Sequence, residues 1–167
     1  MQIKEELGVV IKHHPYYEII NKKIVEEFNT LYYTREMYNS DGGKTNVKAL
    51  QTDNNIKTPT LSLIEQWVID EMRIYDQLSY EIKECWAVKY NKDDYTISHH
   101  HKCATYAFVY FVKTPHGSSP LVFTTSGKKI KAEEGKLIIF PGFLRHKVPK
   151  NRCDGRMTIA GNLYHIR

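Results

Sequence analysis

The chain has no run of apolar residues that approaches the roughly 18 needed to cross a membrane as a helix. Its first residues also lack the apolar stretch of a secretory signal. We therefore expect a protein of the cytoplasm with no membrane partner.

Cysteine is scarce. The chain has three cysteines, Cys85, Cys103 and Cys153, and no CxxC pair. This pattern excludes a disulfide scaffold and the common zinc modules, and it is typical of free thiols in a reducing compartment. Cys103 lies two residues after His101, where a thiolate ligand for zinc or copper is conceivable, but no second thiol lies nearby.

Internal repeats, low-complexity tracts and Pro/Gly-rich linkers are also missing, so the 167 residues are expected to form a single domain, residues 1–167. The net charge is +5, but the basic residues are scattered along the chain. No stretch combines aromatic and basic residues as base-stacking proteins do, so nucleic acid is not a favoured partner.

The first half of the chain, residues 1–80, is expected to provide helical support. Residues 9–12 can form a short strand, and apolar residues recur at helical spacing over 17–29. The polar stretch 38–55 is expected to be mostly loop. A second helix is expected to start at Thr58-Pro59, with Ser62 and Glu65 as a capping box.

From residue 83 onward the pattern changes to short strands separated by turn signals. This spacing indicates a mainly β fold, a jelly roll over 83–167 with the N-terminal helices packed on one sheet. The expected strands are 85–90, 96–101, 105–112, 121–125, 129–132, 136–140 and 156–164.

Histidines in this strand-rich half have the spacing of metal ligands. Side chains alternate along a strand, so His99 and His101 share one face while His100 points away. Two imidazoles about 6–7 Å apart on one strand can hold one metal ion. A third ligand from a distant strand, His146, would close a facial triad with open positions for substrate and oxygen.

The order of the motifs resembles a known family. The His-x-His strand is followed by an aromatic strand, a Gly-led strand that runs into Phe140-Pro141, then His146, and finally Arg156-Met157-Thr158. Over residues 86–162 this looks like the double-stranded β-helix of the iron(II)/2-oxoglutarate-dependent oxygenases. It is most similar to the small versions encoded by marine bacteriophages and bacteria.

The resemblance implies a set of site residues. His99 and His146 would be the first and last iron ligands, and His101 falls where most of the family has an aspartate. Arg156 matches the arginine that pairs with the far carboxylate of 2-oxoglutarate, and Thr158 the hydroxyl beside it. The role suits arginine, whose rigid fork binds a carboxylate through two hydrogen bonds.

Four further residues are candidates for the pocket. The hydroxyl of Tyr110 could reach the far carboxylate of 2-oxoglutarate. Trp86, Tyr90 and Asn162 are candidate substrate contacts, and Asn162 shares strand parity with Arg156 and Thr158. The remaining histidines, at 13, 14, 116 and 165, are expected at the surface.

The resemblance further implies Fe(II), 2-oxoglutarate as cosubstrate and O2. The expected reaction is hydroxylation or demethylation of a peptide or small molecule, with release of succinate and CO2. Two alternatives stay open. A neutral three-histidine set also resembles that of cupin-type thiol dioxygenases, although Arg156 argues against it. A non-catalytic jelly-roll module with a structural metal would carry the same ligands.

Overall fold

The computed structural model describes residues 8–38 and 42–166 and contains two antiparallel sheets. The larger sheet has the strand order β1 (Val10–His13), β9 (Lys136–Pro141), β6 (Tyr106–Lys113), β11 (Arg156–His165), β4 (Tyr80–Tyr90) and β3 (Leu50–Gln51). The smaller sheet has the order β2 (Val47–Lys48), β5 (Tyr95–His99), β10 (His146–Val148), β7 (Leu121–Phe123) and β8 (Lys129–Ile130).

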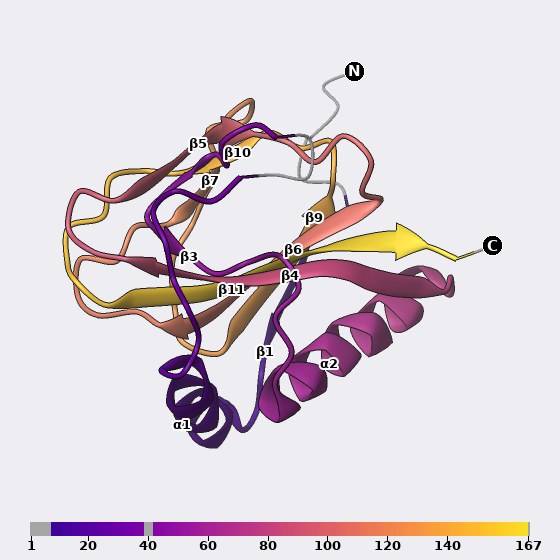
Figure 1. The fold of residues 1–167 in the computed structure, drawn as a ribbon. Helices are drawn as coiled ribbons and strands as arrows, with labels where there is room; N and C mark the ends of the chain where they lie inside the picture. Colours follow the sequence, from indigo (N-terminus) through magenta and orange to yellow (C-terminus); the bar gives the residue numbers. More distant parts are fainter. Residues whose placement is uncertain (1–7, 39–41, 167) are drawn as a thin grey trace.

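Two helices, α1 (Tyr17–Phe28) and α2 (Pro59–Asp76), cover the outer face of the larger sheet, and the smaller sheet lies on its other side (Figure 1). This confirms the predicted mainly β jelly roll with helices on one sheet. No helix in the described residues is long and apolar enough to span a membrane.

The helices begin where the sequence predicts, but the second is capped differently. Thr58 accepts a hydrogen bond from the backbone N–H of Leu61 at 3.2 Å, and Pro59 occupies the first turn. Ser62 and Glu65 lie inside the helix, so the predicted capping box was wrong. The sequence offers two overlapping cap signals, and the proline selects the earlier one because it fits only the first turn.

The N-terminal half contributes more than helices. Within the stretch expected to be mostly loop, β2 pairs with β5 and β3 pairs with β4, while residues 39–41 lie outside the described part. Together with β1, which pairs with β9, they extend both sheets. Strands of two residues are too short to show periodicity, so only their pairing partners reveal them.

The two faces of the larger sheet carry different chemistry, as β11 shows. Met157, Ile159 and Leu163 join the apolar cluster under the helices, where Phe28 and Met72 are fully buried. Arg156 and its same-face neighbours point instead between the two sheets. Because side chains alternate along a strand, one strand serves both the helix-covered core and the interior cavity.

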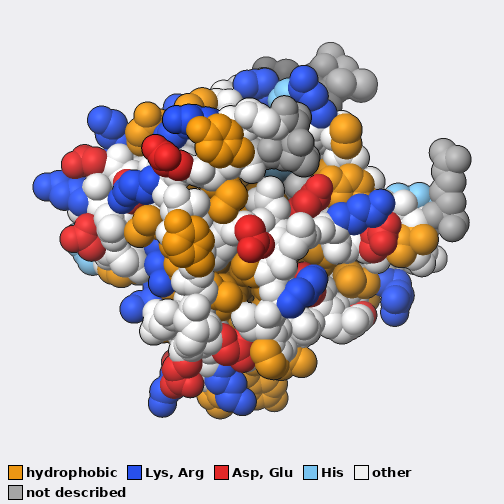
Figure 2. All heavy atoms as spheres, in the orientation of Figure 1, with side chains coloured by type: hydrophobic (Ala, Val, Ile, Leu, Met, Phe, Trp, Pro, Cys, Tyr) orange, Lys and Arg blue, Asp and Glu red, His pale blue; other side chains and the backbone are white. Residues whose placement is uncertain are grey.

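The surface shows no concentration of one charge on the face drawn in Figure 2. Lysine and arginine side chains are interspersed there with aspartate and glutamate. This mixture fits the scattered basic residues of the sequence and gives that face no character of a polyanion-binding surface.

Candidate metal and cosubstrate site

Two of the candidate ligands meet across neighbouring strands. His99 is the last residue of β5 and His146 the first of β10, and they are direct partners in the antiparallel pairing. Their ring centroids are 4.3 Å apart. The pairing of two strands that are far apart in sequence therefore places two imidazoles side by side.

His101 reaches the same place from outside the strand. β5 ends at His99, and the backbone N–H of His101 then donates to the carbonyl of Gly142 at 2.8 Å. The His101 ring lies 5.1 Å from that of His99 and 5.3 Å from that of His146. One nitrogen from each of the three rings lies within 4.8 Å of the others, so they can hold one ion.

Gly142 is needed for this approach. A β-carbon there would lie 2.2 Å from the carbonyl oxygen of Ala104 and 3.0 Å from that of His101. His100 turns away and its Nδ1 lies 3.1 Å from Nη1 of Arg145. The expected direction of His100 is thus found, but a turn after β5 produces it rather than continued strand alternation.

The three histidines are held in the neutral form that metals require. Desolvation by burial lowers the pKa of each ring, with that of His101 falling to about 3. Nδ1 of His99 lies 2.8 Å from the carbonyl of Ile97, and Nδ1 of His146 lies 2.9 Å from that of Leu144. A carbonyl only accepts, so both rings carry their proton on Nδ1 and leave Nε2 free as a ligand.

The triad lies in the wall of a cavity between the two sheets. The cavity, counted together with its opening to solvent, has about 480 Å³ of space not filled by atoms, and its lining is largely apolar. Trp86 and Tyr90 from β4 and Thr158 from β11 line it together with the histidines and Arg156. The fold thus brings together seven of the residues singled out from the sequence, and adds Val88 and Ala160 from the same strand faces.

Arg156 is the most informative residue of this cavity. Its side chain is fully buried, and only Nε has a partner, the carbonyl of Ser119 at 3.1 Å. Both terminal guanidinium nitrogens lack a hydrogen-bond partner in the part of the chain that the structure describes. The rings of Tyr90 and Phe111 lie 4.4 Å and 5.3 Å from the guanidinium carbon and support the charge from its faces.

The burial and the free donors of Arg156 together indicate what kind of ligand the cavity can bind. Burial lowers the pKa of the guanidinium, yet arginine remains charged in proteins, so the structure holds a desolvated cation with two free donors. A carboxylate would satisfy both donors in a fork-to-fork pair. The residues present therefore fit an anionic, carboxylate-bearing ligand beside a metal held by histidines.

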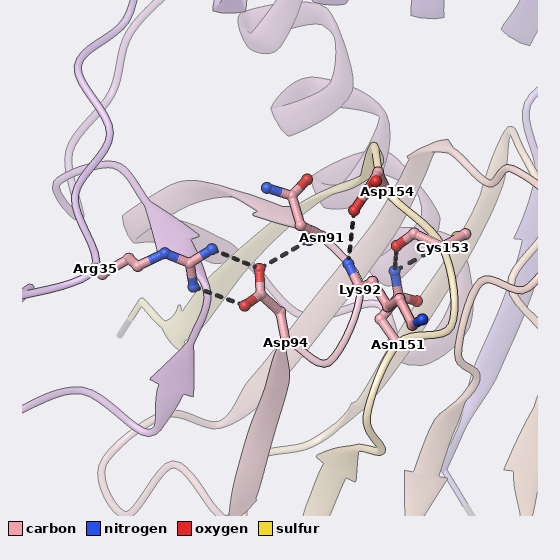
Figure 3. Close-up of polar contacts among 7 residues, drawn as sticks. All are labelled: Arg35, Asn91, Lys92, Asp94, Asn151, Cys153 and Asp154. Atoms are coloured by element: carbon pink, nitrogen blue, oxygen red, sulfur yellow. Dashed lines mark hydrogen bonds and ion pairs between the residues drawn. The ribbon is translucent and has the colours of Figure 1, made fainter.

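A polar network fixes the guanidinium in place at this end of the barrel. Oδ1 of Asn151 accepts from the N–H of Ser119. Its Nδ2 donates to the carbonyl of Cys153 at 2.6 Å (Figure 3). Ser119 in turn accepts from Arg156. Asn151 is almost completely buried and joins the two loops on either side of the guanidinium.

The same network is tied to the turn between β4 and β5. Asp94 accepts two hydrogen bonds from the guanidinium of Arg35, at 2.6 Å and 3.1 Å, and Asp154 accepts from the N–H of Lys92 (Figure 3). Polar side chains thus lock the start of β11, where Arg156 lies, to the neighbouring turn. Sequence reasoning missed Asn151 and Ser119, because nothing in their local pattern marks them.

Tyr110 is not where the sequence reasoning placed it. It lies on the helix-facing side of β6, where its hydroxyl donates to Oδ1 of Asn21 at 2.7 Å. The prediction that it reaches the cosubstrate carboxylate was wrong. On β6 the residues of opposite parity, Ala107 and Val109, line the cavity instead.

Asn162 and Cys103 lie at the outer edge of the site. Asn162 lines a second pocket next to the cavity, and its Nδ2 donates to Glu84 at 3.2 Å. Cys103 is exposed, lines the same outer pocket and is not part of the histidine cluster. Glu84 was not singled out from the sequence, although it shares strand parity with Trp86.

No family model and no curated protein matches this sequence. Solved structures do match. One is the viral collagen prolyl hydroxylase of Paramecium bursaria Chlorella virus-1 in complex with 2-oxoglutarate, at 12% identity and TM-score 0.72, covering 93% of this chain and 95% of the other. Another is a Trichoplax adhaerens prolyl hydroxylase bound to a hypoxia-inducible-factor peptide, at 11% and 0.69, covering 95% and 83%.

A third similar structure is HygX from Streptomyces hygroscopicus with nickel, 2-oxoglutarate and hygromycin B bound. It is 10% identical with TM-score 0.70, over 97% of this chain and 87% of the other. The likeness extends over nearly the whole chain in all three cases. The chain therefore has the double-stranded β-helix fold of the iron(II)/2-oxoglutarate oxygenases, with a buried three-histidine cluster inside it.

Proposed function

We propose that this protein is an iron(II)/2-oxoglutarate-dependent dioxygenase. His99, His101 and His146 hold the metal, and Arg156 and Thr158 bind the far carboxylate of 2-oxoglutarate. When bound, iron(II) and 2-oxoglutarate supply the oxidation of a substrate C–H bond by O2, with formation of succinate and CO2.

The observation that carries the proposal is the unpaired guanidinium. A fully buried arginine with two free donors is costly unless an anion fills the site, and the cavity in front of it is shared with the histidines. A dicarboxylate that chelates a metal at one end and meets an arginine at the other matches both features.

The chain's own residues have separate tasks in this proposal. The carbonyls of Ile97 and Leu144 keep Nε2 of two histidines unprotonated. Ser119 orients the arginine fork through Nε. The apolar walls keep water away, which strengthens the pairing between guanidinium and carboxylate. The protein thus positions the reactants and sets the electrostatics around them.

Peptides and small molecules are the proposed substrate classes. Among proteins of similar fold, one is bound to a peptide and another to hygromycin B. Hydroxylation and demethylation both begin with oxidation of a C–H bond, so the same site serves either outcome.

The proposal is tested by two measurements on one preparation. Titration calorimetry without oxygen should show binding of 2-oxoglutarate to the iron(II)-loaded protein. Mass spectrometry in air should then show slow succinate formation without substrate, above an iron-only blank. Absence of both binding and succinate would refute the proposal.

A second candidate is a thiol dioxygenase of the cupin type, and His101 is the observation that favours it. With His101 in the place of the usual carboxylate, the ligand set is three neutral imidazoles. Oxygen uptake that depends on cysteine rather than 2-oxoglutarate would support this candidate. If neither compound is consumed while metal still binds, the site is a structural metal centre.

A further inference from the structure

An outer pocket adjoins the cavity on the side away from Arg156. Counted together with its wide opening to solvent, it has about 1020 Å³ of space not filled by atoms. It shares Val47, Trp86, His99 and His101 with the inner cavity. Its remaining lining is mostly polar and includes Glu84, Gln51 and Asn162. A molecule in this outer pocket would therefore lie directly against the histidine cluster.

Glu84 brings a negative charge to this pocket that is not paired with any cation among the described residues. Its carboxylate accepts from Nδ2 of Asn162 at 3.2 Å and from the hydroxyl of Tyr164 at 2.9 Å, and both donors are neutral. Within residues 8–38 and 42–166, no lysine, arginine or histidine forms an ion pair with Glu84. A carboxylate can accept about four hydrogen bonds, so acceptor capacity remains.

Two buried amide oxygens add to this acceptor character. Nδ2 of Asn162 donates to Glu84, and Nε2 of Gln51 donates to Oδ1 of Asn54 at 3.1 Å, which sets the orientation of both amides. The opposite atoms, Oδ1 of Asn162 and Oε1 of Gln51, are buried and have no partner among the described residues. Both side chains are at least nine-tenths buried and both line the pocket. Such atoms are rare unless something binds them.

The pairing of β4 with β11 sets the distances along the site. Opposite each other lie Arg156 and Tyr90, then Thr158 and Val88, then Ala160 and Trp86, and finally Asn162 and Glu84. Each step advances about 6.6 Å along the strands. The ring of Trp86 lies 6.3 Å from that of His101, so the metal ligands sit near the third step.

The two ends of the site therefore differ in charge. A cation for an anionic ligand lies at the buried end, and a carboxylate with unpaired acceptors lies one step beyond the metal ligands on the open side. Lys102 is the lysine in the lining of the outer pocket, and it is exposed at the rim. The two ends therefore carry side chains of opposite charge.

We propose that the outer pocket recognises a protonated amine on the substrate, with Glu84 as its counter-ion and Asn162 and Gln51 as further acceptors. The inference rests on the proposed oxygenase function. The amine would lie about 6.6 Å from the carbon that faces the metal ligands, a span of about five bonds of 1.5 Å in a flexible chain. The side chain of lysine has this length and charge.

Equilibrium binding tests the proposal independently of turnover. The probes are L-lysine, the tripeptide acetyl-Ala-Lys-Ala-amide, and their norleucine counterparts, which have the same chain without the charge. Titrations use the full chain loaded with zinc, with and without 2-oxoglutarate. We expect at least one lysine probe to bind about tenfold or more tightly than its norleucine match, the scale for a charge-assisted hydrogen bond.

Glu84→Gln should abolish that preference, because glutamine keeps the shape and an oxygen for Asn162 and Tyr164 but loses the charge. The matched control is Glu81→Gln on the same strand, where Glu81 pairs with Lys83 and does not line the pocket. It should leave the preference unchanged. Unaltered 2-oxoglutarate binding in both variants would show that the fold is intact.

The outcomes are separable. Equal binding of lysine and norleucine probes, or loss of preference in both glutamate variants, overturns the amine subsite. Lack of 2-oxoglutarate binding alongside a Glu84-dependent lysine preference overturns the oxygenase function but keeps the subsite. Tighter binding of the tripeptide than of free lysine identifies a peptide as the source of the amine, and the reverse identifies a free amine.

Discussion

The two faces of the larger sheet differ in how many of their buried polar groups have hydrogen-bond partners. On the helix-covered face the packing is apolar, and Tyr110 and Asn21 form a matched polar pair among Phe28, Ile64 and Met72. The Tyr33 hydroxyl at the margin of this cluster is buried without a partner in the described residues. On the cavity face both terminal nitrogens of a buried guanidinium and two buried amide oxygens have no partner there. The first face is built for stability, and the second keeps unsatisfied groups for a ligand at some cost in stability.

The helix-covered face should show the largest change in stability. Phe28→Ala removes a fully buried ring from beneath α1 and should lower the free energy of unfolding by about 3–5 kcal/mol. Urea denaturation measures the change, and Ile19→Ala, an exposed position on the same helix, is the control. A loss near zero for Phe28→Ala would mean that the helices do not pack on the sheet as described.

The cavity face should behave in the opposite way. Arg156→Met should weaken 2-oxoglutarate binding by about 2–4 kcal/mol, because it removes the partner of a desolvated carboxylate. The same change should raise the stability of the ligand-free protein by about 1–4 kcal/mol, since it removes a buried charge without an anion. Calorimetry and urea denaturation measure the two effects.

The prediction depends on the two effects of Arg156→Met having opposite signs, with weaker 2-oxoglutarate binding and higher stability. Weaker binding together with lower stability would indicate that the variant has damaged the strand. Iron(II) affinity should change little, because Arg156 is not a ligand. Equal loss of metal and 2-oxoglutarate binding would contradict the separation of roles in the cavity.

The proposed metal ligands allow the same comparison within one short segment. His99→Ala and His101→Ala should each lower metal affinity by about 100-fold or more, above the 10–100-fold typical of residues that only support a ligand. His100→Ala should leave affinity unchanged, and His101→Asp should keep metal binding because carboxylate is a common third ligand. Titration with a competing chelator measures all four, and a loss in His100→Ala with none in His101→Ala would refute the assignment.

Tyr110→Phe gives the smallest effect and separates the two faces directly. It leaves Oδ1 of Asn21 buried without its donor, so unfolding should become easier by about 1–3 kcal/mol. Binding of 2-oxoglutarate should stay the same within error, as it should for the exposed-position control Tyr16→Phe. Weakened 2-oxoglutarate binding in Tyr110→Phe alone would restore this tyrosine to the cavity.

The strands, the paired histidines and Arg156 could be picked out from the sequence, because each shows in a short stretch of residues. Alternation of apolar residues marks a strand wherever it pairs, and a His-x-His with a distant histidine and an arginine has few other uses. The fold class and the histidine cluster followed from these patterns, while the resemblance to the oxygenases pointed to Arg156 and Thr158. Tyr110 was predicted on the wrong face of β6. Alternation along the strand separates its two faces, but only the packing of the sheets decides which face lines the cavity.

Long-range pairing decided the rest. Residues 47–48 and 50–51 form strands only because they pair with β5 and β4. His101 joins the cluster through a turn held by Gly142, not through the strand that the sequence suggested. Asn151, Ser119 and Gln51 gain their roles from contacts with segments far away in the sequence.

The sequence by itself determined the chemistry, since it sets which side chains alternate on each strand and therefore which ligands and which cation exist. Only the tertiary structure decided that Arg156 is buried with two free donors, and that Glu84 faces the open side with no cation of residues 8–38 and 42–166 paired to it. The physical reason is that desolvation and the lack of a partner are properties of the assembled environment. No local pattern in a chain records them.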